Sequence, residues 1–244
     1  MKDDFTIESN ECVAERTWRL VLLSDDTHYL FSGEFVDIAV PGFYLRRPIS
    51  VCDSSEGRIV LYYKVVGEGT KALSGMAQGS RLNLLTGLGN GFDASLCTSS
   101  ALLVGGGLGS APLYPLAREL KAAGKNVRVI LGFNKASETV LEEEFRSLCD
   151  GVEITTMDGS RGIKGLVSDA PSFHRTDYDC FYTCGPLVMM KAVCKALPIP
   201  GQLSLEERMG CGSGFCYGCT VQTASGPRRV CKDGPVFNKE DMIW

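Results

Sequence analysis

Histidine is nearly absent from this sequence, since it occurs among 244 residues only at His28 and His174. Both stand in polar stretches typical of loops, and we expect both at the protein surface. A hydrolase that relies on a histidine base, or a zinc enzyme that relies on histidine ligands, would have little to work with. The sequence therefore disfavours these two classes.

A surplus of basic charge is missing too. The chain carries 25 lysines and arginines against 29 aspartates and glutamates, a formal net charge of −4, and it has no basic block. Proteins that bind nucleic acid present a concentrated positive surface to the phosphates. We therefore expect no nucleic-acid partner.

The sequence also lacks a long uninterrupted apolar run. Its most apolar stretch, residues 101–117, is broken by Gly105, Gly106, Gly107, Gly109, Pro112 and Pro115, and it does not read as a membrane span. The first residues are acidic where a signal peptide needs an apolar core. We expect no membrane association and a cytoplasmic location. In that reducing compartment, clusters among the eleven cysteines indicate metal binding or redox chemistry and not disulfides.

What is present is the composition of an ordinary folded protein, with 44% hydrophobic and 22% charged residues. In the first part of the chain, short runs of branched and aromatic residues alternate with turn residues, which is typical of a small antiparallel β-barrel. These runs are Phe5–Val13, Trp18–Leu23, Phe35–Val40, Arg58–Val66 and Arg81–Leu85.

The pattern changes near Ala101. Predicted strands at 101–104, 127–133, 152–156 and 178–183 alternate with predicted helices at 111–123, 140–149 and 187–196. Such alternation is typical of a doubly wound parallel sheet. The tail after residue 200 is rich in glycine and cysteine and too short for an apolar core, so metal is expected to organise it. We expect three domains, over residues 1–97, 98–200 and 201–244.

The tail holds the strongest motif. Four residues separate Cys211 from Cys216, two separate Cys216 from Cys219, and eleven separate Cys219 from Cys231. This is the plant-type ligand spacing of a 2Fe-2S cluster, and the glycines in the loop let backbone N–H groups turn toward the anionic sulfurs. The alternative is a structural zinc site, but zinc ribbons favour paired C-x2-C units, and the tail has one. The spacing predicts a 2Fe-2S cluster on these four cysteines.

Three weaker motifs together suggest a flavin site. They are Arg47-Pro48-Ile49-Ser50 after a strand, Tyr62-Tyr63-Lys64 on another strand, and Gly69-Thr70 at the start of a short helix. They would supply an arginine fork for phosphate, a hydroxyl beside a flavin ring, and a glycine-threonine turn suited to a pyrophosphate. The alternative treats Arg47 as a surface charge, the tyrosines as core and edge residues, and Gly69 as an ordinary turn.

A glycine-rich loop stands between an apolar strand and a helix. It reads Gly105-Gly106-Gly107-Leu108-Gly109-Ser110. Glycines at that place let the backbone approach a dinucleotide phosphate. The loop departs from G-x-G-x-x-G because Ser110 takes the last position, and no acid closes the next strand. An ordinary glycine-rich turn is the alternative.

A second loop, Cys184-Gly185-Pro186, follows the strand at 178–183. Doubly wound sheets bind ligands at the carboxyl ends of their strands, so Cys184 is a candidate for contact with nicotinamide. The alternative is a buried thiol that acts as a small apolar side chain, which is how we interpret Cys12, Cys52, Cys97, Cys149, Cys180 and Cys194. The run Glu142–Glu144 on a predicted helix is interpreted as a solvated face.

Taken in order, these motifs resemble the ferredoxin-NADP reductase superfamily over essentially the whole chain. Within it, the stretches 209–219 and 230–237 are similar to the electron-transfer subunits of dihydroorotate dehydrogenase B. The resemblance implies a six-stranded antiparallel β-barrel FAD domain, a doubly wound parallel-sheet NAD domain and a small C-terminal 2Fe-2S domain. It implies FAD at Arg47–Ser50, Tyr62–Lys64 and Gly69–Thr70. It also implies NAD as an exchanging substrate at Gly105–Gly109 and Gly185–Pro186, with Cys184 as the catalytic residue.

The function implied is that of an oxidoreductase subunit in de novo pyrimidine (UMP) biosynthesis. Electrons would pass between the FMN of a separate dihydroorotate dehydrogenase catalytic subunit and NAD, through the cluster and FAD. The resemblance implies a heterotetramer with two copies of each subunit, and the chain alone is not expected to oxidise dihydroorotate.

Three alternatives stay open. One is the small subunit of NADH-dependent ferredoxin-NADP oxidoreductases, which looks similar but has aspartate at the position of Cys211. Another is a flavin reductase or hydrogenase-associated diaphorase that uses the same cofactors with another partner. The third is a zinc-organised scaffold whose glycine loops bind nothing.

Overall fold

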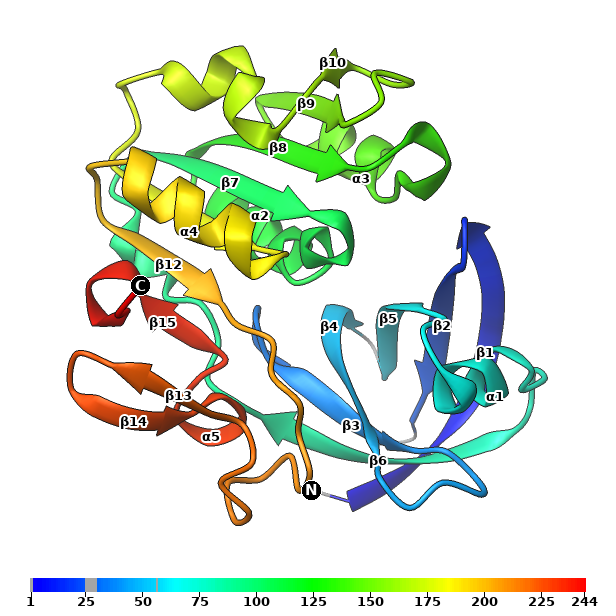
Figure 1. Ribbon diagram of the computed structural model, residues 1–244. Helices are drawn as coiled ribbons and strands as arrows, with labels where there is room; N and C mark the ends of the chain where they lie inside the picture. Colours follow the sequence, from blue (N-terminus) through cyan, green and yellow to red (C-terminus); the bar gives the residue numbers. More distant parts are fainter. Residues whose placement is uncertain (1, 25–29, 56) are drawn as a thin grey trace.

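The computed structural model describes residues 2–24, 30–55 and 57–244, so His28 lies outside the described residues. A β-barrel formed by the first part of the chain stands beside an α/β layer formed by the middle part, and the C-terminal segment lies against both (Figure 1). Among the described residues, no helix is long and apolar enough to cross a membrane.

The barrel consists of six antiparallel strands, as expected, and closes in the order β1-β2-β5-β4-β3-β6. The strands are β1 (Lys2–Ala14), β2 (Thr17–Leu23), β3 (Phe35–Ala39), β4 (Arg47–Ser55), β5 (Arg58–Lys64) and β6 (Arg81–Leu88). A strand exposes alternate residues on opposite faces, so Ile59, Leu61 and Tyr63 of β5 fill the barrel interior. The short helix α1 (Glu68–Ser74) connects β5 to β6 and buries Leu73 in the same core.

The α/β layer is built on a seven-stranded sheet with the order β10-β9-β8-β7-β11-β12-β15. Its strands are β7 (Ser100–Gly106), β8 (Asn126–Phe133), β9 (Gly151–Thr156), β10 (Ile163–Lys164), β11 (Cys180–Cys184), β12 (Gly201–Ser204) and β15 (Val236–Asn238), and only β15 runs antiparallel to its neighbour. Single 3-10 turns punctuate the chain at η1 (Ala94–Leu96), η2 (Gly107–Ser110), η3 (Ala136–Glu138), η4 (Val167–Asp169), η5 (Pro171–His174) and η6 (Lys239–Asp241).

Helices cover both faces of this sheet. α2 (Leu113–Ala122) and α3 (Glu142–Leu148) pack on one face, where Leu116 and Phe145 join the core. α4 (Leu187–Ala196) packs on the other face through Met190 and Val193 (Figure 1). The barrel residue Tyr62 also belongs to the first of these cores, which therefore joins the barrel to the α/β layer.

The direction in which strands are added reverses at β7. β8 and β9 follow on one side of β7, whereas β11 lies on the other side. In open α/β sheets this reversal opens a crevice at the carboxyl ends of the two central strands. The glycine-rich loop after β7 and the Cys184 loop after β11 both stand at this crevice.

The sheet continues past residue 200, where we expected the third domain to begin. β12 and β15 belong to the segment 201–244 and form one edge of the sheet, while the hairpin β13 (Thr220–Thr223) and β14 (Gly226–Arg229) and the short helix α5 (Val230–Asp233) stand outside it. β12 pairs with β11 over four residues. So short a strand has too little alternation to be detected in a sequence.

Two interpretations of single residues need correction. Glu142, expected on a solvated face, is buried, and its carboxylate forms ion pairs with Arg146 at 2.9 Å and Arg161 at 2.6 Å. Cys12, expected to be buried, is exposed. The end of β1 is exposed on both faces, since Glu11 and Val13, the neighbours of Cys12, are exposed as well.

Candidate cofactor and cluster sites

The four predicted cluster cysteines lie in two segments that the fold brings together. Cys211, Cys216 and Cys219 lie in the loop before β13, and Cys231 lies in α5, directly after the β13–β14 hairpin. The guanidinium of Arg229 braces this arrangement, because its Nη1 donates to the carbonyl of Gly214 at 2.8 Å and its centre lies 4.8 Å from the centre of the Tyr217 ring.

Backbone N–H groups point at the sulfurs. Phe215 N and Cys216 N donate to Cys211 Sγ at 3.2 Å and 3.3 Å, and Gly218 N donates to Cys216 Sγ at 3.4 Å. Cys231 N donates to Cys219 Sγ at 3.4 Å. Donors in these positions stabilise thiolates and the negative charge of a cluster.

The pKa values of the thiols reflect this environment. Burial acts to raise the pKa of Cys211, but the N–H groups around its sulfur outweigh burial and bring the pKa down to about 6. The pKa of Cys231 is raised to about 12 by burial and by the neighbouring thiol of Cys219. A thiolate is the form that ligates metal, so Cys211 is ready to ligate near neutral pH.

The geometry separates the two metals considered for this motif. A single tetrahedral zinc ion would draw all four sulfurs around one centre. Here hydrogen bonds link the residues in two pairs, since Cys216 N donates to Cys211 Sγ and Cys231 N donates to Cys219 Sγ. Although all four residues are described, no three of their sulfurs lie within 4.8 Å of one another. Two pairs suit a cluster in which each of two irons takes two thiolates.

Arg47 and Gly69, two residues of the predicted flavin motifs, meet in space. The Arg47 guanidinium occupies the place where a β-carbon at position 69 would stand. Arg47 Nη1 also donates to the carbonyls of Leu45 at 2.6 Å and Arg46 at 3.1 Å, and its guanidinium centre lies 5.2 Å from the centre of the Phe43 ring. The arginine fork is thus held over the turn that leads into α1.

The other flavin candidates take different positions. Tyr63 donates its hydroxyl to Asn10 Oδ1 at 2.9 Å inside the barrel, and Tyr62 is buried on the opposite face of β5. Thr70 Oγ1 accepts from Val66 N and Gly67 N, so this hydroxyl orders the turn before α1. Lys64 Nζ forms an ion pair with Glu138 Oε1 at 3.0 Å.

The remaining residues of the arginine motif lie on β4. Pro48, Ile49 and Ser50 are half-buried there, and Asp37 on β3 faces Pro48 across the antiparallel pair. The barrel therefore determines the position of the strand that carries this motif, and Ile49 packs against the barrel core.

The two predicted nicotinamide loops pack directly on each other. Gly109 lies against the carbonyl of Cys184, so that a β-carbon at position 109 would collide with that carbonyl. Gly185 has φ +147°, which favours glycine, and a β-carbon on it would stand 2.8 Å from the backbone of Gly106. Both loops are therefore confined to a shape that only glycine allows.

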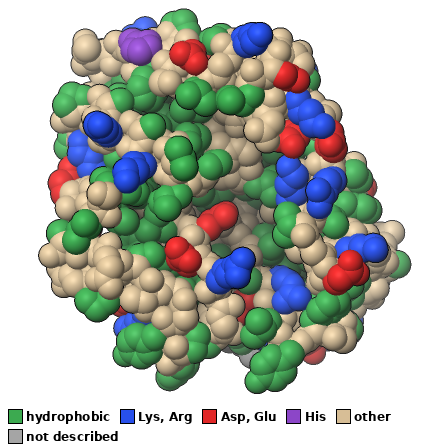
Figure 2. Space-filling view, in the orientation of Figure 1, with side chains coloured by type: hydrophobic (Ala, Val, Ile, Leu, Met, Phe, Trp, Pro, Cys, Tyr) green, Lys and Arg blue, Asp and Glu red, His purple; other side chains and the backbone are tan. Residues whose placement is uncertain are grey.

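A cavity of about 740 Å³ opens beside these loops. Its lining includes the carboxyl ends of β7, β8, β9 and β11 and one side of α4, together with Lys64 from the barrel. Figure 2 shows a hollow near the middle of the molecule, with hydrophobic side chains along its upper margin. The volume and the largely apolar lining suit a dinucleotide.

Within this region the predicted loop residues have different positions. Gly106, Gly107, Gly109, Gly185 and Pro186 line the cavity, whereas Gly105 is buried at the end of β7. The Cys184 side chain is also buried, and burial raises the pKa of its thiol.

Two acidic residues were missed. Glu206 is an exposed residue that lines the large cavity two residues after β12, and loss of solvent around its carboxyl group in that cavity raises the pKa of the group. Asp37 on β3 is 2% exposed and lies beneath the cluster loop, where a β-carbon on Gly212 would stand 2.5 Å from Asp37 Oδ2. Burial raises the pKa of Asp37 to about 6 against the opposing effect of Arg46. Glu206 could have been predicted, because it is an acidic residue just after the carboxyl end of a strand. No local sequence pattern distinguishes Asp37 as a residue of the site.

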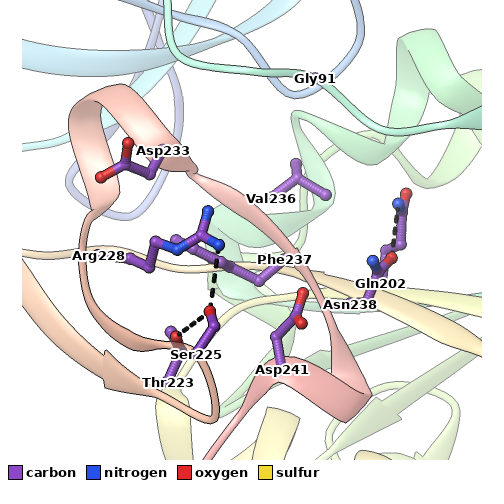
Figure 3. A pocket seen from close by; sticks show the side chains of 10 residues that line it. All are labelled: Gly91, Gln202, Thr223, Ser225, Arg228, Asp233, Val236, Phe237, Asn238 and Asp241. Atoms are coloured by element: carbon purple, nitrogen blue, oxygen red, sulfur yellow. Dashed lines mark hydrogen bonds between the residues drawn. The ribbon is translucent and has the colours of Figure 1, made fainter.

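A smaller polar cavity of about 200 Å³ lies between the β13–β14 hairpin and the sheet edge (Figure 3). Its side chains bond to one another, since Arg228 Nη2 donates to Ser225 Oγ at 3.1 Å and Gln202 Nε2 donates to Asn238 Oδ1 at 3.1 Å. Thr223 Oγ1 donates to the carbonyl of Gly226 at 2.7 Å. These bonds order the hairpin and the sheet edge separately, and the hairpin is joined to the segment after β15 by Ala224 N, which donates to the carbonyl of Asp241 at 2.8 Å.

Comparisons with known proteins agree with this geometry. Residues 206–243 match a family model described as the iron-sulfur cluster binding domain of dihydroorotate dehydrogenase B. Relatives called dihydroorotate dehydrogenase B (NAD(+)), electron transfer subunit, include one from Fusobacterium nucleatum subsp. nucleatum, 36% identical over 98% of each chain. Another, from Geobacillus kaustophilus, is 37% identical over 99% of this chain and 98% of its own length.

Solved structures extend the comparison. An NADH-dependent reduced ferredoxin-NADP oxidoreductase chain superposes with a TM-score of 0.89 and 32% identity, over 98% of this chain and 90% of that one. A flavohemoglobin from Malassezia yamatoensis superposes with a TM-score of 0.67 and 18% identity, over 80% of this chain and 56% of that one. The second likeness concerns the fold alone.

Proposed function

The chain belongs to the family of electron transfer subunits of NAD-dependent dihydroorotate dehydrogenase B, and we propose which of its residues carry the electrons and hold the cofactors. It is an oxidoreductase subunit of pyrimidine biosynthesis that works with FAD, a 2Fe-2S cluster and NAD. The observation that carries the assignment of residues is the arrangement of four thiols in two neighbouring pairs.

Cys211, Cys216, Cys219 and Cys231 ligate the cluster in this proposal. Their N–H···S bonds offset the negative charge of the ligand set, and Arg229 fixes the loop between the first cysteines through Gly214. We propose that residues 1–97 bind FAD, residues 98–200 bind NAD and residues 201–244 bind the cluster. The cluster segment contributes two strands, β12 and β15, to the sheet of the NAD segment.

Arg47 and the turn at Gly69–Thr70 hold the phosphates of FAD in this proposal, and the strand segments Pro48–Ser50 and Tyr62–Lys64 flank its ring. Support comes from the fork of Arg47 over Gly69 and from the hydroxyl of Thr70, which orders the same turn. Because both tyrosine side chains are packed elsewhere, β5 would contribute its backbone and Lys64. When bound, FAD exchanges two electrons with nicotinamide and single electrons with the cluster.

NAD enters the 740 Å³ cavity in this proposal. Gly105–Gly109 let its phosphates approach the backbone, and the loop Cys184-Gly185-Pro186 holds the nicotinamide end. Cys184 shapes that loop from behind through its carbonyl, which packs on Gly109. Its thiol is buried and kept protonated at neutral pH.

A partner subunit is implied by the name of the relatives. We infer that it is an FMN-containing catalytic subunit, that two copies of each chain assemble, and that the complex is cytoplasmic. Two observations support docking near the cluster: Phe215 and Tyr217, both on the cluster loop, are 84% and 65% exposed. Large aromatic side chains exposed on a loop are typical of interfaces.

A second function rests on the structural similarity to the ferredoxin-NADP oxidoreductase. In that case the partner would be a ferredoxin-linked subunit. Cys211 favours the dihydroorotate dehydrogenase function, because the resemblance implies aspartate at this position in the ferredoxin-NADP oxidoreductases. The two functions use the same cofactors and differ only in the partner.

The test begins with protein purified without oxygen. Iron, sulfide and zinc are measured together with the flavin absorption and the EPR spectrum after reduction. We expect two irons, two sulfides and one flavin per chain, and oxidation of dihydroorotate with reduction of NAD(+) only after the catalytic subunit is added. Stoichiometric zinc without iron would overturn the cluster assignment, and turnover by the chain alone would overturn the division of labour.

A further inference from the structure

Two cysteines and an aspartate meet at the edge of the sheet opposite the cofactor loops. Cys97 ends the segment that connects the barrel to β7, and Asp179 and Cys180 stand at the start of β11. One ligand atom from each lies within 4.8 Å of the others. Cys97 and Cys180 are 2% and 0% exposed, whereas Asp179 is half-buried. The group thus sits just beneath the surface.

The carboxylate of Asp179 is held in place from one side only. Its Oδ2 accepts hydrogen bonds from Thr98 Oγ1 at 2.5 Å, Ser99 N at 2.6 Å, Ser99 Oγ at 2.9 Å and Ser100 N at 3.2 Å. Its Oδ1 is buried and has no hydrogen-bond partner among the described residues. A buried oxygen without an N–H or O–H donor is costly in free energy, and the group beside this carboxylate is the thiol of Cys97.

The carboxyl group of Asp179 is ionised at neutral pH. Burial acts to raise the pKa of Asp179, but the hydrogen bonds from Thr98, Ser99 and Ser100 outweigh it and hold the pKa well below its usual range. The group is therefore a carboxylate with one saturated oxygen, beside two thiols whose pKa values are raised by burial and of which Cys97 bonds to the carboxylate. Two cysteines and an aspartate are a ligand set that zinc accepts, and ligating carboxylates in such sites are themselves hydrogen-bonded.

We propose that Cys97, Cys180 and Asp179 Oδ1 bind a divalent, thiol-seeking cation of the zinc class, with water in the fourth position. The site is independent of the cluster, because none of the cysteines at 211–231 belongs to it. The interpretation as small apolar side chains holds for Cys52 and Cys194, which are also buried but join no such group of ligand atoms.

The location gives the site a structural role. Cys97 directly follows η1, and Asp93 is the N-cap residue of η1. The hydroxyl of Tyr182, on β11, donates to the carbonyl of Asp93 at 2.8 Å. A cation bound between Cys97 and Cys180 would add a second tie between this connection and the central strand. It would thereby restrict movement of the barrel relative to the α/β layer.

The experiment uses the full chain with its cluster and flavin, dialysed without oxygen against buffered micromolar Zn²⁺. Zinc and iron are counted in the same sample by mass spectrometry, and zinc X-ray absorption gives the ligands. We expect one zinc per chain at undiminished iron, with about two sulfurs near 2.3 Å and oxygen or nitrogen ligands near 2.0 Å. Four sulfurs with loss of iron would mean that zinc had replaced the cluster, and would overturn the proposal.

Variants locate the metal. Cys97→Ala is expected to weaken zinc binding at least tenfold, whereas Cys194→Ala, which removes a buried thiol outside the group, should bind zinc as the parent does. Zinc retained in Cys97→Ala, or no zinc in the parent, contradicts the proposal. Flavin and iron content show whether each variant has folded, and if Cys97→Ala has not, the sulfur count in the parent decides.

Discussion

The guanidinium of Arg47 fills the space that a side chain on Gly69 would need. These two residues come from different parts of the barrel, β4 and the start of α1. Arg47 Nη1 is bonded to the carbonyls of Leu45 and Arg46, so Nε and Nη2, which lie over Gly69, are the donors that a phosphate would meet. The contact therefore ties two of the proposed FAD segments to each other.

Gly69→Ala is expected to displace Arg47 and to weaken FAD binding about tenfold or more, or roughly 1.4 kcal/mol. Flavin content after purification and FAD titration by fluorescence measure the effect. Gly75→Ala is the matched control, because a β-carbon there meets nothing closer than 3.6 Å. Equal FAD affinity in both variants would remove the Arg47–Gly69 contact from the FAD site.

Gly109→Ala should affect NAD and spare FAD, since the new methyl group would collide with the Cys184 carbonyl. We expect the KM for NADH to rise about tenfold or more, with flavin content unchanged. Gly69→Ala is the reciprocal control, because its NADH binding, followed by titration, should stay normal. If Gly109→Ala kept its KM, the two loops would not form the NAD site.

Cys219→Ser is expected to keep FAD and to lose the cluster signal together with electron delivery to the catalytic subunit. The reason is that serine offers iron no thiolate while the barrel is untouched. EPR after reduction and a coupled NADH assay measure the two losses. Cys12→Ser is the control, because it replaces an exposed thiol that is distant in sequence from the cluster cysteines. It should keep both the cluster signal and electron delivery. Normal transfer in Cys219→Ser would exclude this residue as a ligand.

Glu142→Ala should destabilise the α/β layer by about 1 to 3 kcal/mol, because it removes a buried carboxylate bonded to Arg146 and Arg161. Glu143→Ala, at an exposed position on the same helix, is expected to stay within about 0.5 kcal/mol of the parent. Urea unfolding followed by circular dichroism measures both. An equal effect of the two substitutions would mean that the ion pairs add nothing.

The same pair of variants has a predicted pH dependence. Burial acts to raise the pKa of Glu142, but hydrogen bonds from Arg161 and Arg146 lower it below the ordinary value of 4.5. A lowered folded pKa adds stability above the unfolded value, and this is lost as pH falls through the folded pKa. The difference between the parent and Glu142→Ala should therefore shrink below pH 4.5. A constant difference down to acid pH would contradict this assignment.

Long periodic elements could be predicted from the sequence, and irregular ones could not. The helix expected at 187–196 is observed with the same bounds as α4, and the strand expected at 127–133 differs from β8 by one residue. β4 was not among the predicted strands, and it contains Pro48 and Asp53, residue types that are depleted in strands. Neighbouring strands on both sides supply the pairing that makes it a strand.

The sequence by itself determined which chemistry this protein can perform, since the cysteine spacing, the arginine motif and the glycine loops are local patterns whose residue types limit what they bind. Only the tertiary structure decided which residues stand next to one another. Folding divides the cluster cysteines into two pairs, buries Glu142, places Asp37 beneath the cluster loop and joins Cys97 to Cys180. These relationships depend on strand pairing and packing between distant segments, which no local pattern records.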